Sequence, residues 1–182
     1  MTGERPGRPL QGRGAVSNPA GRFESRRFAP VEDAWWAEDE PPAAVPTTVT
    51  PEATRSILSR NDSPDIPFDR SINPYKGCEH GCVYCFDRPT HSFLGLSPGL
   101  DFETRIFSKP KAADLLREEL AKPAYRCEVV ALGANTDPYQ PVERRLGITR
   151  AILEVLAEHR HPVSIVTKSS LVLRDLDLIV PM

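Results

Sequence analysis

Short runs of β-branched and apolar residues recur in the second half of the chain. They occupy residues 70–76, 127–132 and 162–167, and each is bounded by Gly, Pro or polar residues. Runs of this length and composition predict three short β-strands.

Between these runs, apolar residues recur at helical spacing. Ser108-Lys109-Pro110 has the features of a helix start, and the helix predicted after it ends before Pro123 and carries on one face Ala113, Leu116 and Leu120. A second amphipathic helix is predicted from the positions Ile148, Ile152, Val155, Leu156 and His159. Residues 171–180 predict a third helix.

The alternation of strands and helices predicts an α/β fold with parallel strands joined by right-handed crossovers. Residues 86–107 are expected to form a loop, because Pro89, Gly95, Pro98 and Gly99 interrupt any periodicity. Three strands before the chain stops at Met182 suggest the first half of a partial (β/α)6 TIM-like barrel, incomplete at the C-terminus.

Charge and proline set the first 52 residues apart. Residues 1–27 carry six Arg against two Glu, whereas residues 28–52 carry six acidic residues and no basic one. We interpret residues 1–52 as an irregular arm, disordered or wrapped on a core of residues 53–182. Its arginines are expected to be solvated, with phosphate contact as the alternative, and Trp35-Trp36 to anchor the arm or to form a stacking platform.

The whole chain has a formal charge of −2, which excludes a generically basic nucleic-acid binder. No run approaches the roughly 18 apolar residues of a membrane span, and the N-terminus lacks the apolar stretch of a signal peptide. A cytoplasmic protein with no membrane partner is expected.

Three of the four cysteines, Cys78, Cys82 and Cys85, form a CxxxCxxC motif flanked by Gly77 and containing Gly81. Three thiolates can each bind one iron of a [4Fe-4S] cluster and leave the fourth iron open to a small molecule. The alternatives are a zinc site with His80 or His91 as fourth ligand, or purely structural cysteines. Cys127 is expected to be a small buried hydrophobic residue.

Polar residues follow the second and third predicted strands, at the edge of the sheet where the cysteine loop is expected. They include Thr136, Asp137 and Lys168. A cation and hydroxyl groups at the carboxyl ends of parallel strands suit a carboxylate-bearing cofactor. Turn-forming residues and a solvated lysine are the alternatives.

The CxxxCxxC motif, with Tyr84 just before its last cysteine, resembles the cluster motif of radical S-adenosylmethionine (SAM) enzymes. The resemblance implies that the open iron binds SAM, that one electron cleaves SAM to a 5′-deoxyadenosyl radical, and that Tyr84 lies beside the adenine. It also implies an electron donor of the flavodoxin or ferredoxin type.

Thr-Asp-Pro-Tyr-Gln-Pro from residue 136 and Val-Thr-Lys-Ser from residue 166 resemble the spore photoproduct lyase-like branch, whose members are often labelled DNA repair photolyases. This resemblance implies that Thr136 and Lys168 contact SAM and that the substrate is nucleic-acid-like or another polymer. Two departures set the chain apart. Ala134 stands where the lyase has its hydrogen-donating cysteine, and residues 135–137 replace the usual Gly-Gly-Glu. The reaction itself is therefore not implied. A non-catalytic iron–sulfur or zinc module and an inactive fragment are the competing interpretations.

Overall fold

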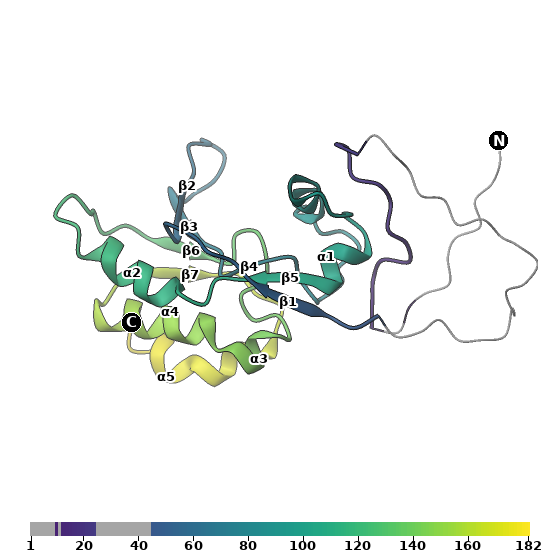
Figure 1. Cartoon of the computed structure of the whole chain (residues 1–182). Coiled ribbons are helices and arrows are strands. Elements are labelled where there is room, and N and C mark those ends of the chain that lie inside the picture. The colour runs from purple at the N-terminus through teal and green to yellow at the C-terminus, as the bar shows by residue number, and fades with distance from the viewer. Residues whose placement is uncertain (1–9, 11, 25–44) are drawn as a thin grey trace, which may run out of the picture. The chain divides into compact units, whose positions relative to one another are not determined.

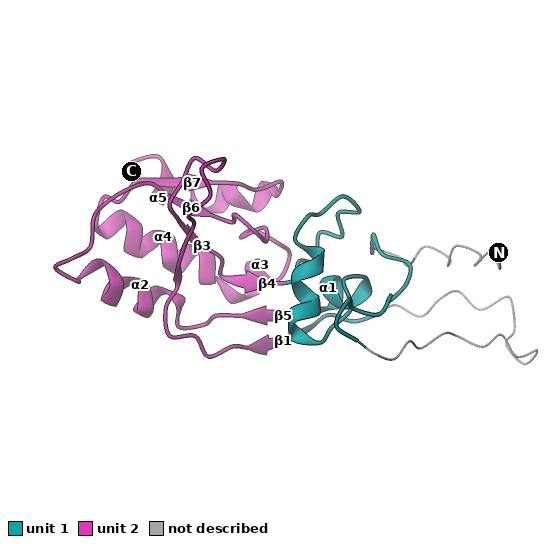
Figure 2. Cartoon of the chain, turned by 90° about the horizontal axis from the view of Figure 1, so that it is seen from above, with its two compact units in different colours: residues 1–48, 77–106 teal, residues 49–76, 107–182 magenta. Residues whose placement is uncertain are grey.

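The structure is a computed structural model that describes residues 10, 12–24 and 45–182 (Figure 1). Trp35-Trp36 lies outside the described residues. The described chain forms two compact units (Figure 2), and each is treated by itself. Unit 1 contains the described residues up to 48 together with 77–106, and unit 2 contains 49–76 and 107–182. The division at residue 52 into arm and core stays a prediction.

Unit 2 contains a four-stranded sheet with the order β2-β3-β6-β7. Its strands are β2 (Leu58–Arg60), β3 (Arg70–Ile72), β6 (Val130–Leu132) and β7 (Val163–Ile165). β3, β6 and β7 are parallel neighbours, which confirms the three predicted strands and their direction, while β2 adds an antiparallel edge.

The first predicted strand is interrupted. Residues 70–76 divide into β3 and a separate strand, β4 (Tyr75–Lys76), with Pro74 between them. Proline has no N–H to donate to a strand ladder, so the strand is interrupted at Pro74. β4 joins a second sheet, of order β1-β5-β4, with β1 (Thr48–Pro51) and β5 (Arg105–Ser108).

Helices α2 (Ala112–Leu120) and α4 (Ile148–Glu158) pack together on one side of the four-stranded sheet (Figure 1). The buried face of α4 follows the predicted periodicity, and Ile152, Leu153, Val155 and Leu156 are fully buried. His159 is the exception, because it caps the end of α4 and is exposed. The core of unit 2 therefore lies between this helix pair and β3, β6 and β7.

The predicted helix start at Ser108 is wrong. Ser108 is the buried last residue of β5 and pairs with Tyr75, while α2 begins later, with Lys111 at its N-cap. Strand pairing of residues 105–108 overrides the local capping preference of Ser.

The loop expected over residues 86–107 is also wrong. This region contains the 3₁₀ helix η1 (Arg88–Leu94), helix α1 (Leu100–Thr104) and most of β5. Pro89 lies in the first turn of η1, Gly95 ends it with a left-handed φ of 69°, and Gly99 precedes α1. The residues interpreted as interruptions thus mark the ends of very short helices.

The remaining helices of unit 2 are α3 (Glu143–Leu146), η2 (Ser170–Asp175) and α5 (Leu176–Ile179). The last two replace the single helix predicted over 171–180. The fold class is thus mixed α/β, as expected, but the sheets of the described residues stay open and no barrel closes. No helix in the described part of the chain is long and apolar enough to span a membrane.

We predict a pH dependence from the buried His161, which is hydrogen-bonded to Tyr125. His161 is 2 % exposed, and its Nδ1 lies 3.0 Å from the Pro162 carbonyl oxygen, so Nδ1 carries the proton and Nε2 accepts from the Tyr125 hydroxyl at 2.6 Å. Burial lowers the pKa of His161 below its ordinary value. The unfolded state therefore binds a proton more readily, and the stability of unit 2 should fall as pH drops below about 6.5.

Urea unfolding between pH 8 and pH 5 measures this loss. His161→Gln should flatten the pH dependence, while His159→Gln, at the exposed position two residues earlier, should change it only slightly, because the charge of His159 is a minor cause of the lowered pKa of His161. Equal pH slopes for wild type and His161→Gln would contradict the assignment.

Candidate functional site

The cysteine motif forms a loop within unit 1. Cys78 is buried, whereas Cys82 and Cys85 are partly exposed. The Cys78 N–H donates to the Phe102 carbonyl oxygen at 2.9 Å, and the Cys85 N–H donates to the Cys82 carbonyl oxygen at 3.2 Å. As their side chains stand, no group of three or more His, Cys, Asp or Glu in the described residues converges on a single metal-ion position.

Two glycines determine the backbone conformation of this loop. Gly77 and Gly81 have φ angles of 77° and 63°, in the left-handed region. A Cβ at Gly77 would lie 2.9 Å from the Phe102 carbonyl oxygen, and one at Gly81 would lie 2.9 Å from the Gly14 nitrogen. Conformation and space thus both exclude a side chain at these two positions, so the backbone packs closely at Gly77 and at Gly81.

A buried carboxylate is connected to this loop through an arginine. Glu103, in α1, is fully buried and accepts hydrogen bonds from the N–H groups of Gly14 and Ala15, each at 2.9 Å. It also forms an ion pair with Arg88. Arg88 in turn donates from Nε to the Cys82 carbonyl oxygen at 3.0 Å. Glu103 thus connects residues 14–15 to the cysteine loop through one guanidinium group.

Arg13 differs from the solvated or phosphate-binding arginine expected in the arm. Its guanidinium donates to the carbonyl oxygens of Glu103 and Val45, each at 2.8 Å, and to Thr47 Oγ1 at 2.9 Å. These bonds fix residue 13 on unit 1 as a structural element.

Other residues of the motif region have contrasting environments. Tyr84 is 79 % exposed, and its neighbours Val83 and Phe86 are 75 % exposed. His91, a zinc-ligand alternative, is fully buried, and its Nε2 lies 3.0 Å from the Arg105 carbonyl oxygen. The aromatic ring expected beside adenine is therefore accessible to solvent, while His91 Nε2 contacts the backbone.

Asp137 and Lys168 come together in unit 2, as expected from neighbouring parallel strands. One Asp137 oxygen accepts from Thr167 Oγ1 at 2.7 Å and from the Tyr139 N–H at 2.8 Å, and the other accepts from the Lys168 N–H at 3.0 Å. The Asp137 carboxylate therefore joins the loops that follow β6 and β7. Lys168 is exposed.

Thr136 is only 2 % exposed, and its hydroxyl donates to the Tyr75 carbonyl oxygen at 2.9 Å. The phenol of Tyr75 bonds to the fully buried carboxylate of Glu143. Burial, and then the negative charge of Glu143, raise the pKa of Tyr75 well above its ordinary value. Tyr75 thus connects β4 through its backbone to the loop after β6, and through its side chain to the start of α3.

Glu143 also organises the start of α4. It accepts from the Thr149 N–H at 3.0 Å, in the first turn of the helix, and pairs with Arg174 at 2.9 Å. A carboxylate at a helix N-terminus compensates the unsatisfied N–H groups there. Sequence reasoning missed both Glu103 and Glu143, because nothing local distinguishes them from solvated acidic residues.

Cys127 contradicts its prediction. It is exposed, three residues before β6 begins, because the strand is shorter than the run 127–132 suggested.

The predicted site residues divide between the two units. Unit 1 contains Cys78, Cys82, Cys85 and Tyr84, and unit 2 contains Thr136, Asp137 and Lys168.

The chain is similar to proteins from bacteria and archaea. It is 49 % identical over 114 residues to "uncharacterized protein Rv2578c" of Mycobacterium tuberculosis and to "uncharacterized protein Mb2609c" of Mycobacterium bovis, which covers 63 % of this chain and 34 % of each relative. It is 32 % identical over 107 residues to "uncharacterized protein MJ0683" of Methanocaldococcus jannaschii, which covers 59 % of this chain and 38 % of the relative. The chain thus spans little more than a third of the length of the curated relatives it matches. No protein-family model and no solved structure matches the chain.

We predict that Glu103→Gln destabilises unit 1. The amide keeps the shape of the side chain but loses its charge, and its NH₂ group would face an N–H donor of residue 14 or 15. The cost should be about 1–3 kcal/mol in chemical unfolding, with faster hydrogen exchange of the Gly14 and Ala15 amides. Glu158→Gln, which removes an exposed carboxylate paired with Arg117, serves as the control and should change little. Unchanged exchange at both amides would show that Glu103 does not hold this segment.

Proposed function

We propose that this chain is the cofactor-binding part of a radical SAM iron–sulfur protein. The observation that carries the proposal is the CxxxCxxC loop, in which glycines with left-handed φ angles directly precede Cys78 and Cys82. A donor set of three thiolates fits a [4Fe-4S] cluster, in which each thiolate binds a different iron and the fourth iron stays open. We extend the proposal to the fold: β3, β6 and β7 are the first strands of a partial (β/α)6 barrel.

Cys78, Cys82 and Cys85 would hold the cluster. A cluster bound there would supply the electron for cleavage of SAM to methionine and a 5′-deoxyadenosyl radical, which would abstract a hydrogen from a nucleic-acid-like or other polymeric substrate. Arg88 fixes the Cys82 backbone and so helps to keep the loop in one conformation. The electron comes from a donor of the flavodoxin or ferredoxin type.

The residues of unit 2 have separate parts in SAM binding. Lys168 is exposed and would bring a positive charge to the SAM carboxylate, and Asp137 accepts a hydrogen bond from the Lys168 N–H. The buried Thr136 hydroxyl bonds to the Tyr75 backbone, which gives this residue a positioning part. In unit 1, the exposed Tyr84 ring offers a face for stacking on adenine.

Cys82→Ala should lose the cluster. After anaerobic reconstitution, the wild-type chain should contain about four iron and four sulfide per chain, and Cys82→Ala far less. Cys127→Ala, which removes the exposed cysteine outside the motif, is the matched control and should keep the full content. Zinc without sulfide in the wild type would reject the radical SAM proposal in favour of a zinc module.

Turnover is tested separately, with dithionite and SAM. Release of 5′-deoxyadenosine supports the proposed chemistry. A full cluster without this product would assign the chain as a non-catalytic module or an inactive fragment, since it spans little more than a third of its relatives' length.

Lys168→Gln should weaken SAM binding to the reconstituted protein by about 10–100-fold, because one charge-assisted contact with the carboxylate is lost. Asp137→Asn should have a smaller effect, since it acts through the Lys168 backbone. Equilibrium dialysis with labelled SAM measures both variants against Lys111→Gln, an exposed lysine before α2. Wild-type affinity in Lys168→Gln would remove this lysine from the site.

A further inference from the structure

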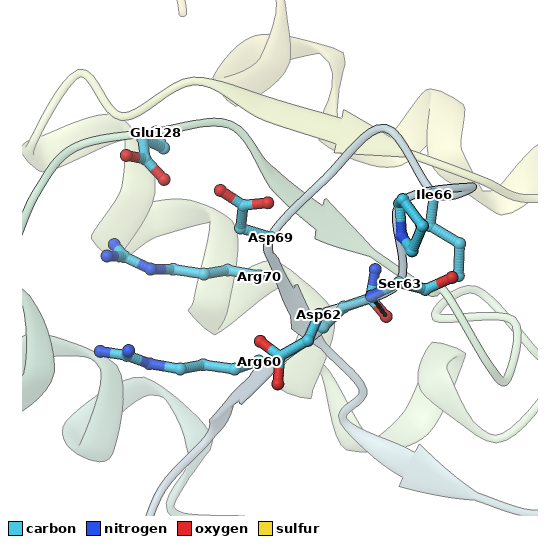
Figure 3. Close-up of a pocket in the computed structure, with 9 residues that line it drawn as sticks. Arg60, Asp62, Ser63, Ile66, Asp69, Arg70 and Glu128 are labelled. Atoms are coloured by element: carbon cyan, nitrogen blue, oxygen red, sulfur yellow. Dashed lines mark hydrogen bonds between the residues drawn. The ribbon is translucent and has the colours of Figure 1, made fainter.

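Two arginines face each other across the β2–β3 pair of unit 2. The antiparallel register places Arg60 directly opposite Arg70. Figure 3 shows the two side chains extending side by side in the same direction. Like charges directly opposite each other on a sheet destabilise it, so this pair is a cost to the fold.

Little in the described residues offsets that cost. Arg70 lies over the Tyr125 ring, 4.6 Å from its centroid, and donates to the Arg126 carbonyl oxygen. Within the described chain, neither Arg60 nor Arg70 has a carboxylate within the 4.0 Å of an ion pair. The Glu119 carboxylate nearby is already paired with Lys122 at 2.8 Å. In the described chain, the two arginines thus form no ion pair of their own, although the Glu119 carboxylate is close enough to feel the charge of Arg60.

The two arginines line two cavities. One, of about 610 Å³, is lined by Arg60 and Arg70 together with Asp62, Asp69 and Glu128 (Figure 3). The other, of about 250 Å³, is lined by the same two arginines together with Leu58, Lys122 and Tyr125. The smaller cavity has three cationic side chains and one carboxylate, Glu119, so an anion would be attracted to it rather than to the larger, more acidic one.

We propose that Arg60 and Arg70 form a phosphate-binding site in the smaller cavity, with Lys122 at its edge. Two planar guanidinium groups side by side can each donate paired hydrogen bonds to phosphate oxygens. A phosphate monoester dianion or a phosphodiester bound here would attract both Arg60 and Arg70 and so offset the repulsion between them. The phosphate belongs either to free inorganic phosphate or to a nucleotide, alone or in a nucleic-acid strand.

This site lies at the end of the sheet opposite to the loops of Asp137 and Lys168. Arg70 begins β3, whereas Asp137 and Lys168 follow the carboxyl ends of the parallel strands β6 and β7. The proposal therefore does not rest on the proposed function, and it can be tested on the chain without any cluster.

Isothermal titration in phosphate-free buffer tests the site with three probes: inorganic phosphate, adenosine monophosphate and an oligothymidylate of eight nucleotides. Arg60→Gln and Arg70→Gln should each weaken binding about tenfold or more. Arg145→Gln, which makes the same change at an exposed position of α3, should stay within about twofold of wild type. Equal affinity for all three probes indicates free phosphate, and tighter binding of the nucleotide or the strand indicates that source.

Thermal melting separates loss of binding from loss of folding. Without phosphate, Arg60→Gln should raise the melting temperature by about 1–3 °C, because a repulsive cross-strand pair is removed. At a probe concentration about ten times the wild-type Kd, the wild type should gain clearly more stability than this variant. The proposal is overturned if no probe binds, if the two variants bind as Arg145→Gln does, or if Arg60→Gln melts below the wild type.

Discussion

The cysteine loop depends on the hydrogen bonds and the ion pair of the buried Glu103 carboxylate. A charged group without solvent is costly unless hydrogen bonds and an opposite charge compensate it. Here the N–H groups of Gly14 and Ala15 and the guanidinium of Arg88 do so together. Because Arg88 also bonds to the Cys82 backbone, the requirement to satisfy one carboxylate fixes three separate segments of unit 1.

In unit 2, two more carboxylates accept hydrogen bonds from separate segments of the chain. The Glu143 carboxylate receives the Tyr75 hydroxyl, the first turn of α4 and Arg174, and the Asp137 carboxylate receives groups from the loops after β6 and β7. In each case an acidic side chain satisfies backbone N–H groups that the short strands and helices leave unpaired. Irregular loops around a site are thus held by carboxylates rather than by extended secondary structure.

The sequence predicts the parts of the fold that depend on repeated local patterns. β-branched runs predict β3, β6 and β7, and the apolar positions of α4 repeat over three turns. It fails where long-range pairing decides the outcome. Ser108 is recruited into β5, and Cys127 is left outside a strand that is shorter than its apolar run. Glu103 and Glu143 are recognisable only from their partners, which lie up to 89 residues away along the chain. The cysteine spacing needs no such context, which is why the candidate ligands could be identified from sequence while their supports could not.

The central claim is that the three motif cysteines bind a cluster with one iron open to SAM. Electron paramagnetic resonance of the reconstituted, dithionite-reduced chain tests it most directly. The account predicts the signal of a reduced [4Fe-4S] cluster that changes when SAM is added, because the cofactor binds the open iron. A cluster signal that SAM leaves unchanged, at concentrations where dialysis shows SAM to be bound, would contradict it.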